Sequence, residues 1–206
     1  MFTGIVQACC KVLAIEKKPG LHTLQIALPP ELLEGLQTGA SVANNGVCLT
    51  VTRVGHDRAF FDVMEETLNL TNLGNLQVHD DVNIERSLQF GKEIGGHILS
   101  GHIHTQAKLV TVDQTDTHYD LTLELPSVWM KYVLYKGFIG INGCSLTIGN
   151  IKNNCFVLHL IPETLRLTNL GRYQPGMFFN IEIDSQTQTI VDTVERVLAQ
   201  KDVAQR

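Results

Sequence analysis

Short runs in which apolar and polar residues alternate recur along the whole chain, and Gly, Pro, Asn and Asp separate them. Alternation with a period of two is typical of half-buried β-strands. Clear examples are residues 22–28, 48–54, 59–64, 120–126 and 156–161. Many short antiparallel strands leave unpaired edges unless each sheet closes on itself. We therefore expect an all-β chain built from small barrels.

The chain contains two copies of one sequence. Four pairs of segments stand at the same offset of 97 residues. The pairs are NNGVCLTV at 44–51 with INGCSLTI at 141–148, ETLNLTNLG at 66–74 with ETLRLTNLG at 163–171, VNIE at 82–85 with FNIE at 179–182, and FTGIV at 2–6 with LSGHI at 99–103. A constant offset across four segments indicates a tandem duplication. We expect one domain at 1–97 and a second at 98–186, with short helical turns in the ETLxLTNLG segments and at PPELLEGL.

The segment at 187–206 follows the second copy and has no counterpart in the first. Its sequence TIVDTVERVL predicts an amphipathic helix, because four apolar residues fall on one face. These are Ile190, Val194, Val197 and Leu198. Such a face must be buried somewhere. Packing on the chain's own barrel and contact with another subunit are both open.

The composition excludes several classes of function. Hydrophobic residues make up 44% of the chain and charged residues 18%, as in ordinary globular proteins. The net charge is -5 and the basic residues are scattered, so we expect no nucleic-acid partner. No apolar run approaches a membrane span, and the N-terminus lacks the pattern of a signal peptide. The five cysteines form no C-x-x-C pair, which favours reduced thiols and a cytoplasmic protein.

Candidate chemistry lies where the two copies differ. Cys48 stands in the place of Ser145, and each follows an Asn-Gly turn and precedes Leu-Thr. Both side chains can act as nucleophiles or hydrogen-bond partners. A cysteine in an apolar strand is also a common small core residue, and a serine near a turn often bonds its own backbone. Both interpretations stay open at each position.

The second copy carries a histidine that the first lacks. His102 stands where the first copy has Ile5, and it can exchange a proton near neutral pH. It belongs to the run GGHILSGHIH with His97 and His104. We expect no metal site there, because no carboxylate or thiol stands at a compatible spacing. The glycines of this run favour a close approach of backbone to a ligand.

Lys136 stands in the place of Gly39 and could anchor a polyol or an anionic group, although an exposed, solvated lysine is the ordinary reading. Together these positions predict two equivalent sites for the same small molecule, one of them with added proton-transfer groups.

Several motifs resemble one family over essentially the whole chain. They are MFTGIVQ, the paired NGVCLTV and NGCSLTI, GGHILSGH, LIPETLRLTNLG, and NIEID with VDTVERVL. The chain is similar to the riboflavin synthases of the cofactor-independent α-chain type. The resemblance implies two tandem six-stranded Greek-key barrels with a C-terminal helix that holds a homotrimer. It also implies a cofactor-free transfer of four carbons between two molecules of 6,7-dimethyl-8-ribityllumazine, which yields riboflavin and 5-amino-6-ribitylaminouracil.

The resemblance also implies two sets of substrate-binding residues. The first barrel would contribute Gly4, Ile5, Val6, Cys48, Leu49, Thr50, Asp62, Val63, Met64, Glu65, Glu66 and Thr67. The second barrel would contribute Gly101, His102, Ile103, Lys136, Ser145, Leu146, Thr147, Ile161, Pro162, Glu163, Thr164, Leu165 and Arg166. Our hypothesis is that His102, supported by Ser145, transfers protons, while Cys48 or water supplies a nucleophile.

One residue departs from the family pattern. Members of the family commonly carry Asp where this chain has Asn142, and an amide cannot act as a base. Asn142 could repeat the turn chemistry of Asn45, since Asn-Gly and Asp-Gly suit similar turns. Alternatively the chain binds the lumazine without turning it over, as fluorescent lumazine proteins do. The retained Cys48, Ser145, His97 and His102 and the complete second copy favour catalysis.

Overall fold

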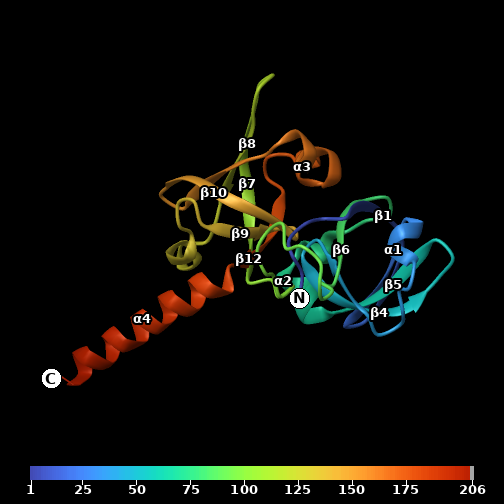
Figure 1. Cartoon of the computed structure of the whole chain (residues 1–206), viewed down its shortest axis with the longest axis horizontal. Coiled ribbons are helices and arrows are strands. Elements are labelled where there is room, and N and C mark those ends of the chain that lie inside the picture. The colour runs from blue at the N-terminus through green and yellow to red at the C-terminus, as the bar shows by residue number, and fades with distance from the viewer. Residues whose placement is uncertain (205–206) are drawn as a thin grey trace.

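The computed structural model describes residues 1–204, which form two barrels and a long C-terminal helix (Figure 1). The first barrel closes in the order β1-β2-β5-β4-β3-β6. Its strands are β1 (Ala8–Lys18), β2 (Leu21–Ala27), β3 (Ser41–Asn44), β4 (Val47–Val54), β5 (Arg58–Met64) and β6 (Asp81–Arg86). All its neighbouring strands pair antiparallel.

The second barrel repeats the first. Its strands are β7 (Thr105–Gln114), β8 (Tyr119–Glu124), β9 (Phe138–Ile141), β10 (Cys144–Lys152), β11 (Cys155–His159) and β12 (Phe178–Ile183). Read from β7, the closed order is β7-β8-β11-β10-β9-β12, the order of the first barrel. The predicted fold class, two tandem six-stranded all-β barrels followed by a helix, is confirmed.

Short helices connect the strands where the sequence predicts them. The ETLxLTNLG segments form α2 (Glu65–Leu70) with η1 (Asn72–Asn75), and α3 (Pro162–Leu167) with η3 (Leu170–Arg172). PPELLEGL contains α1 (Pro30–Leu33), and η2 (Ser127–Tyr132) lies between β8 and β9.

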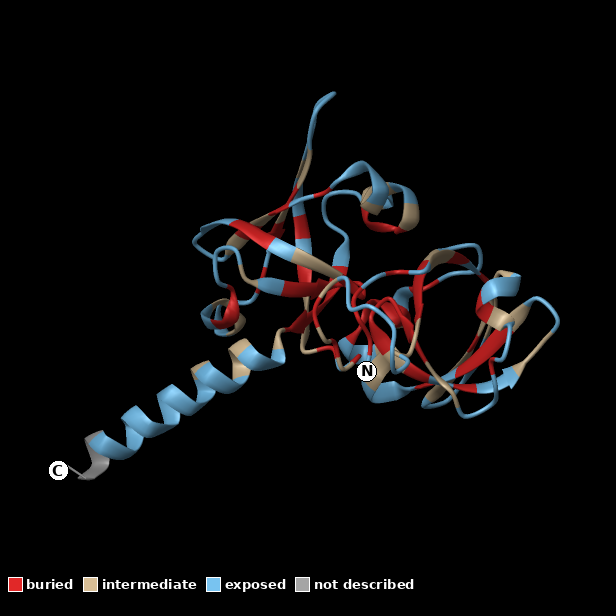
Figure 2. Ribbon diagram, viewed as in Figure 1, coloured by how far each residue is buried: buried red, intermediate tan, exposed pale blue. Residues whose placement is uncertain are grey.

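Each barrel has its own hydrophobic core (Figure 2). Phe61 is fully buried in the first barrel, and Phe156 and Phe179 are fully buried in the second. Burying such a side chain contributes about 1.5–3 kcal/mol. Alternate residues of each strand supply these cores, which is why a pattern with a period of two identified them.

The two copies exchange their opening segments. Phe2 and Leu99 form an antiparallel bridge, with Phe2 N donating to Leu99 O at 2.8 Å and Leu99 N donating to Phe2 O at 3.0 Å. Beyond this bridge each segment runs on to the other barrel. Val6 packs in the core of the second barrel, and Ile103 packs in the core of the first. Each barrel is therefore completed by a short segment from the other copy.

Buried asparagines join the barrels around this exchange, in three equivalent pairs. They are Asn45 with Asn142, Asn72 with Asn169, and Asn83 with Asn180. Asn142 Oδ1 accepts from Asn72 Nδ2 at 2.9 Å and from Asn180 N at 2.8 Å. Asn45 Oδ1 accepts from Asn169 Nδ2 and from Asn83 N, both at 2.9 Å. Because buried amides need partners, this network fixes how the barrels meet.

Helix α4 (Ser185–Ala204) projects away from both barrels (Figures 1 and 2). One face is tied to its own barrel: Gln188 bonds His104 at 3.1 Å, and Asp192 accepts from the Tyr132 hydroxyl. The predicted apolar face points elsewhere, and its four residues are exposed by 43 to 64%. Packing on the chain's own barrel is therefore excluded for that face.

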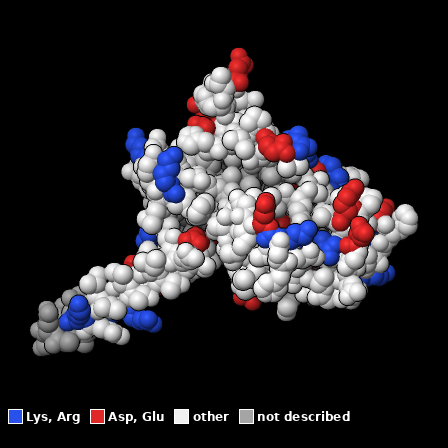
Figure 3. Space-filling model, in the orientation of Figure 1, with Lys and Arg blue, Asp and Glu red and all other residues white. Residues whose placement is uncertain are grey.

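On the face seen in Figure 3, Lys and Arg are interspersed with Asp and Glu. Of the helices within residues 1–204, none combines the length and the apolar character that crossing a membrane requires.

Candidate functional site

The two candidate nucleophiles occupy equivalent places at the start of β4 and β10. Each follows a tight turn whose two central residues have positive φ, 46° and 81° at Asn45-Gly46 and 44° and 80° at Asn142-Gly143. Asn-Gly is the sequence that such hairpin turns favour. Cys48 and Ser145 are both half-buried. Neither is a fully buried core residue, so both are accessible to a ligand.

Asn142 performs the structural task of Asn45. It is fully buried, and its side-chain amide donates to Tyr173 Oη at 3.0 Å and to Asn169 Oδ1 at 3.4 Å. The reading in which Asn142 repeats the turn chemistry of Asn45 is therefore supported, and the network between the barrels adds a second role that the sequence did not indicate. A carboxylate is not needed at this position to hold the turn.

The Ser145 site is enclosed by the opening segment of the first copy. Ser145 N donates to Gly4 O at 2.8 Å. A Cβ on Gly4 would lie 2.5 Å from Ser145 Cβ, and one on Gly96 would lie 2.6 Å from it. Only glycine permits these approaches, which explains the glycines that flank this site.

His97 is the imidazole at this site. Its Nδ1 lies 2.6 Å from Ser145 Oγ, and its ring stacks on Phe138 with centroids 5.2 Å apart. Only 8% of His97 is exposed, and within the described residues its Nε2 has no hydrogen-bond partner. Burial lowers the pKa of His97, and the charge of Asp184 opposes that shift. The ring is thus kept neutral, in the state that can accept a proton from Ser145.

The Cys48 site is enclosed in the same way by the opening segment of the second copy. Cys48 N donates to Gly101 O at 2.8 Å, and a Cβ on Gly101 would lie 2.5 Å from Cys48 Cβ. His102 follows Gly101 and is exposed. His102 therefore belongs to the Cys48 site.

These contacts correct the expected grouping of the pocket residues. Gly4, Ile5 and Val6 were assigned to the site of Cys48, but Gly4 lies against Ser145. The segment 101–103 was assigned to the site of Ser145, but Gly101 lies against Cys48. Within one chain the imidazole bonded to Ser145 is that of His97 and not that of His102. The error arose because each opening segment was taken to pack on its own barrel.

Four of the predicted binding residues turn their side chains into the barrel cores. They are Val6, Leu49, Val63 and Ile103, each exposed by 9% or less. At these positions only the backbone is available to a ligand. Thr50 and Thr147, by contrast, are exposed beside the two nucleophiles.

The remaining predicted residues lie at the end of β5, in β10, and in or beside the short helices α2 and α3, apart from Lys136, which precedes β9. Met64 precedes α2 with 69% of its surface exposed, and Ile161 precedes α3 with 63% exposed. Arg166 forms a bidentate ion pair with Glu163 on α3. Lys136 is exposed with φ 64°, and its Nζ lies 5.2 Å from the Tyr135 ring.

An apolar rim borders the Ser145 site. Phe138, which stacks on His97, is 48% exposed, and Ile5, next to Gly4, is 46% exposed. Apolar side chains around a few polar groups are typical of sites for flat ring ligands.

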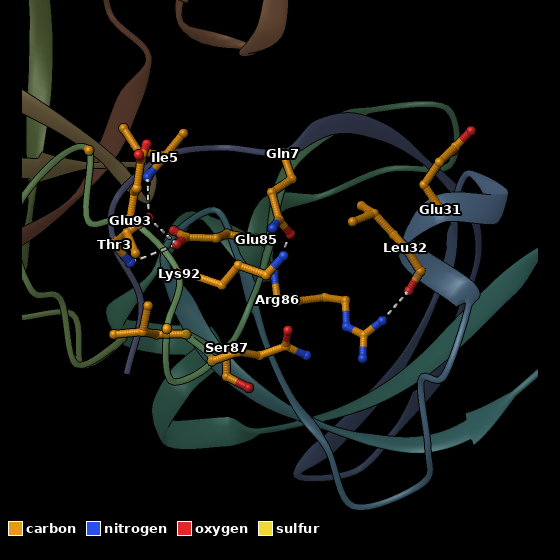
Figure 4. A pocket seen from close by; sticks show the side chains of 14 residues that line it. Thr3, Ile5, Gln7, Glu31, Leu32, Glu85, Arg86, Ser87, Lys92 and Glu93 are labelled. Carbon is orange, nitrogen blue, oxygen red and sulfur yellow. Dashed lines mark hydrogen bonds between the residues drawn. The ribbon is translucent and has the colours of Figure 1, made fainter.

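A cavity of about 670 Å³ adjoins this site without containing it (Figure 4). It lies between the segment after β6 and the first barrel. Thr3, Ile5 and Glu85 line it, while neither Cys48 nor Ser145 is among its described lining residues. Its most basic group, Arg86, is already bonded to Glu34 O at 2.7 Å. We therefore place the chemistry at Cys48 and Ser145. Within residues 1–204, no three His, Cys, Asp or Glu side chains gather as a metal site.

Known proteins resemble the chain over its full length. The family model of the lumazine binding domain matches it twice, at residues 3–87 and 100–184. The riboflavin synthase of Escherichia coli (strain K12) is 52% identical over 205 residues, which span 99% of this chain and 96% of that protein. The riboflavin synthase of Chlamydia pneumoniae is 42% identical over 199 residues, spanning 97% of this chain and 98% of that protein.

Solved structures share the fold. LumP complexed with riboflavin matches with a TM-score of 0.83 at 30% identity, covering 90% of this chain and 100% of that one. LumP complexed with 6,7-dimethyl-8-(1'-D-ribityl) lumazine matches with a TM-score of 0.82 at 28% identity and the same coverage.

Proposed function

The chain belongs to the riboflavin synthase family of proteins with two lumazine binding domains, and from that premise we propose that it converts two lumazines into riboflavin. One molecule of 6,7-dimethyl-8-ribityllumazine gives four carbons to another, and 5-amino-6-ribitylaminouracil is the second product. The products contain all the atoms of two substrates, so the reaction needs no oxidant or cofactor. The observation that carries the proposal is the pair of equivalent, glycine-lined sites at Cys48 and Ser145.

Two sites suit a reaction between two copies of one molecule. Holding both substrates in a fixed geometry replaces a rare encounter in solution. The sites need not be identical, because one substrate loses a proton at its C7 methyl group while the other is attacked at C7. The differences between Cys48 and Ser145, and between Ile5 and His102, fit this division of roles.

We assign proton transfer at the second-barrel site to Ser145 with His97. The 2.6 Å contact between Oγ and Nδ1 and the lowered pKa of His97 support a neutral base that acts through the hydroxyl. At the other site, Cys48 or a water supplies the nucleophile, with His102 as the neighbouring proton carrier. The predicted binding residues at 62–67, Lys136 and 161–166 complete the two pockets in this proposal.

A homotrimer is part of the proposal. The exposed apolar face of α4 supports it, because such a stripe on a projecting helix needs a partner surface. In a trimer the first barrel of one subunit would face the second barrel of another and bring a Cys48 site to a Ser145 site. A cytoplasmic location also stays a proposal, supported by five free cysteines.

The test is to incubate the purified protein with the lumazine and no other reagent, and to follow riboflavin by absorbance and chromatography. We expect one riboflavin for every two lumazines consumed. Tight binding of the fluorescent lumazine without new riboflavin would support a binding protein of the LumP kind instead.

A further inference from the structure

Two buried glutamates occupy equivalent places in the last strand of each barrel. Glu85 lies in β6 and Glu182 in β12, and 182 − 85 = 97, the offset of the duplication. Each is only 4% exposed. Among the ion pairs of the described residues, none involves either carboxylate. Two carboxylates buried without an ion pair require an explanation, since burial of a charge is strongly unfavourable.

The Glu182 carboxylate holds the segment that encloses the Cys48 site. Its Oε1 accepts from Ser100 N at 2.6 Å and from Ser100 Oγ at 2.7 Å, and its Oε2 accepts from Gly101 N at 3.1 Å. Ser100 Oγ in turn accepts from His102 N at 3.1 Å. Because Gly101 O accepts from Cys48 N, Glu182 in the second barrel is linked through Gly101 to the backbone of Cys48 in the first.

Glu85 makes the same contacts with the opening segment of the first copy (Figure 4). Its Oε1 accepts from Thr3 N at 2.6 Å and from Thr3 Oγ1 at 2.7 Å, and its Oε2 accepts from Gly4 N at 3.0 Å. Thr3 Oγ1 accepts from Ile5 N at 3.2 Å. Gly4 O completes the chain by accepting from Ser145 N.

A glycine makes the backbone of each of these segments flexible unless contacts with other residues fix it. Gly4 and Gly101 have φ of 74° and 83°, and glycine has the greatest backbone freedom of any residue. The residue after Gly101 is His102, which is exposed, and no described side-chain hydrogen bond fixes its ring. The position of that ring therefore depends on how the backbone of 100–101 is held.

We propose that Glu182 is a positioning residue, which fixes the Ser100-Gly101 backbone so that His102 stands at the Cys48 site. Glu85 is its counterpart, which fixes Thr3-Gly4 so that Ile5 borders the Ser145 site. The inference rests on the proposed function for its effect on turnover. The hydrogen bonds by which each glutamate holds its segment, here called the clamp, are a property of the fold. A hydrophobic residue would fill either place in the barrel without the desolvation of a charge, so holding these segments is what the carboxylates contribute.

The test compares Glu182→Gln with its matched control Glu85→Gln. Glutamine keeps the volume and one acceptor oxygen, but turns an NH2 group toward the backbone donors. For Glu182→Gln we expect kcat to fall by about 10- to 100-fold with little change in KM, since a small misplacement near the reacting atoms has that effect. For Glu85→Gln we expect mainly a higher KM, because the residue it places is an apolar contact.

A double variant separates positioning from a general structural role. If Glu182 acts through His102, Glu182→Gln should cause no further loss of kcat once His102 has been replaced by Gln. Losses that multiply in the double variant, or an unchanged kcat in Glu182→Gln, would overturn the inference.

A measurement without turnover keeps the inference separate from the proposed function. In amide NMR spectra of the intact protein, hydrogen bonds to a carboxylate should shift the Ser100 and Gly101 amide protons downfield. Glu182→Gln should lose that shift, while Glu85→Gln should lose it only at Thr3 and Gly4. Unchanged amide shifts in Glu182→Gln would refute the clamp even if the wild type makes riboflavin. A wild type that makes none would refute only the function.

Discussion

Replacing Gly101 by Ala tests the exchange of opening segments directly. The new Cβ would lie 2.5 Å from Cys48 Cβ and 2.9 Å from both Cys48 N and Phe2 Cε2. Two penalties add at this site. A left-handed backbone, here with φ 83°, costs a non-glycine residue roughly 1–2 kcal/mol. Forcing an extra carbon into a packed site costs about 1–3 kcal/mol more. The free energy of unfolding should therefore fall by about 2–5 kcal/mol.

Gly35→Ala is the matched control. Gly35 also has positive φ, 64°, but nothing lies within 4 Å of its added Cβ. Its loss should be the backbone penalty alone, roughly 1–2 kcal/mol. The two variants are compared by urea denaturation at one protein concentration, because unfolding of an oligomer depends on concentration. Equal losses in Gly101→Ala and Gly35→Ala would show that Gly101 does not pack against Cys48 and would refute the exchanged arrangement.

Further predictions concern four other parts of the molecule. Because burial lowers the pKa of His97, its neutral form persists to lower pH, and kcat should fall only below pH 6.5. A fall of kcat that begins above that pH would contradict the assignment of His97 as the base. The same group should make the fold less stable as the pH falls below 6.5, since the unfolded chain takes up the proton more readily. Asn142→Asp sets a carboxylate oxygen against Asn169 Oδ1 and should lower the free energy of unfolding by about 1–3 kcal/mol in urea denaturation. An unchanged free energy of unfolding would refute the role of the asparagine network. Val194→Glu on the apolar face of α4 should yield monomers in light scattering, while Ala199→Glu on the opposite face of the helix should not. A retained trimer in Val194→Glu would exclude this face as the contact. Lys136→Gly relieves a left-handed backbone, so the free energy of unfolding should stay equal or rise by up to ~1 kcal/mol. Titration with the lumazine should show weaker binding to this variant, and an unchanged affinity would remove Lys136 from the site.

The two copies and many of their strands were predictable from the sequence, because strand alternation and a constant offset report burial and repetition directly. Six strands in each barrel were implied by the family resemblance. The exchange was not accessible. Alternation shows that Val6 and Ile103 are buried, but not in which barrel, and both opening segments have the same pattern. The pairing of His97 with Ser145 was missed for a related reason. Comparison of the copies could not single out His97, since 97 − 97 = 0 and the first copy has no residue there.

Two sets of shared residues build the fold and are buried. The turn asparagines are fully buried, and Glu85 and Glu182 are each 4% exposed. Cys48 and Ser145, which differ, are half-buried, and Ile5 and His102 are exposed at the edges of the sites.

The backbone at Lys136 matches that of its counterpart in the first copy, Gly39. It keeps the left-handed conformation of Gly39, with φ of 64° against 90°, and its N donates to Ile148 O as Gly39 N donates to Val51 O. A lysine tolerates that conformation less well than glycine, and such strain is found where function maintains it. The backbone is thus alike at these two positions, while side chains at the sites, such as Lys136, His102 and Cys48, differ between the copies. In a reaction between two copies of one molecule, those side chains are what can distinguish the substrate that gives carbon from the one that receives it.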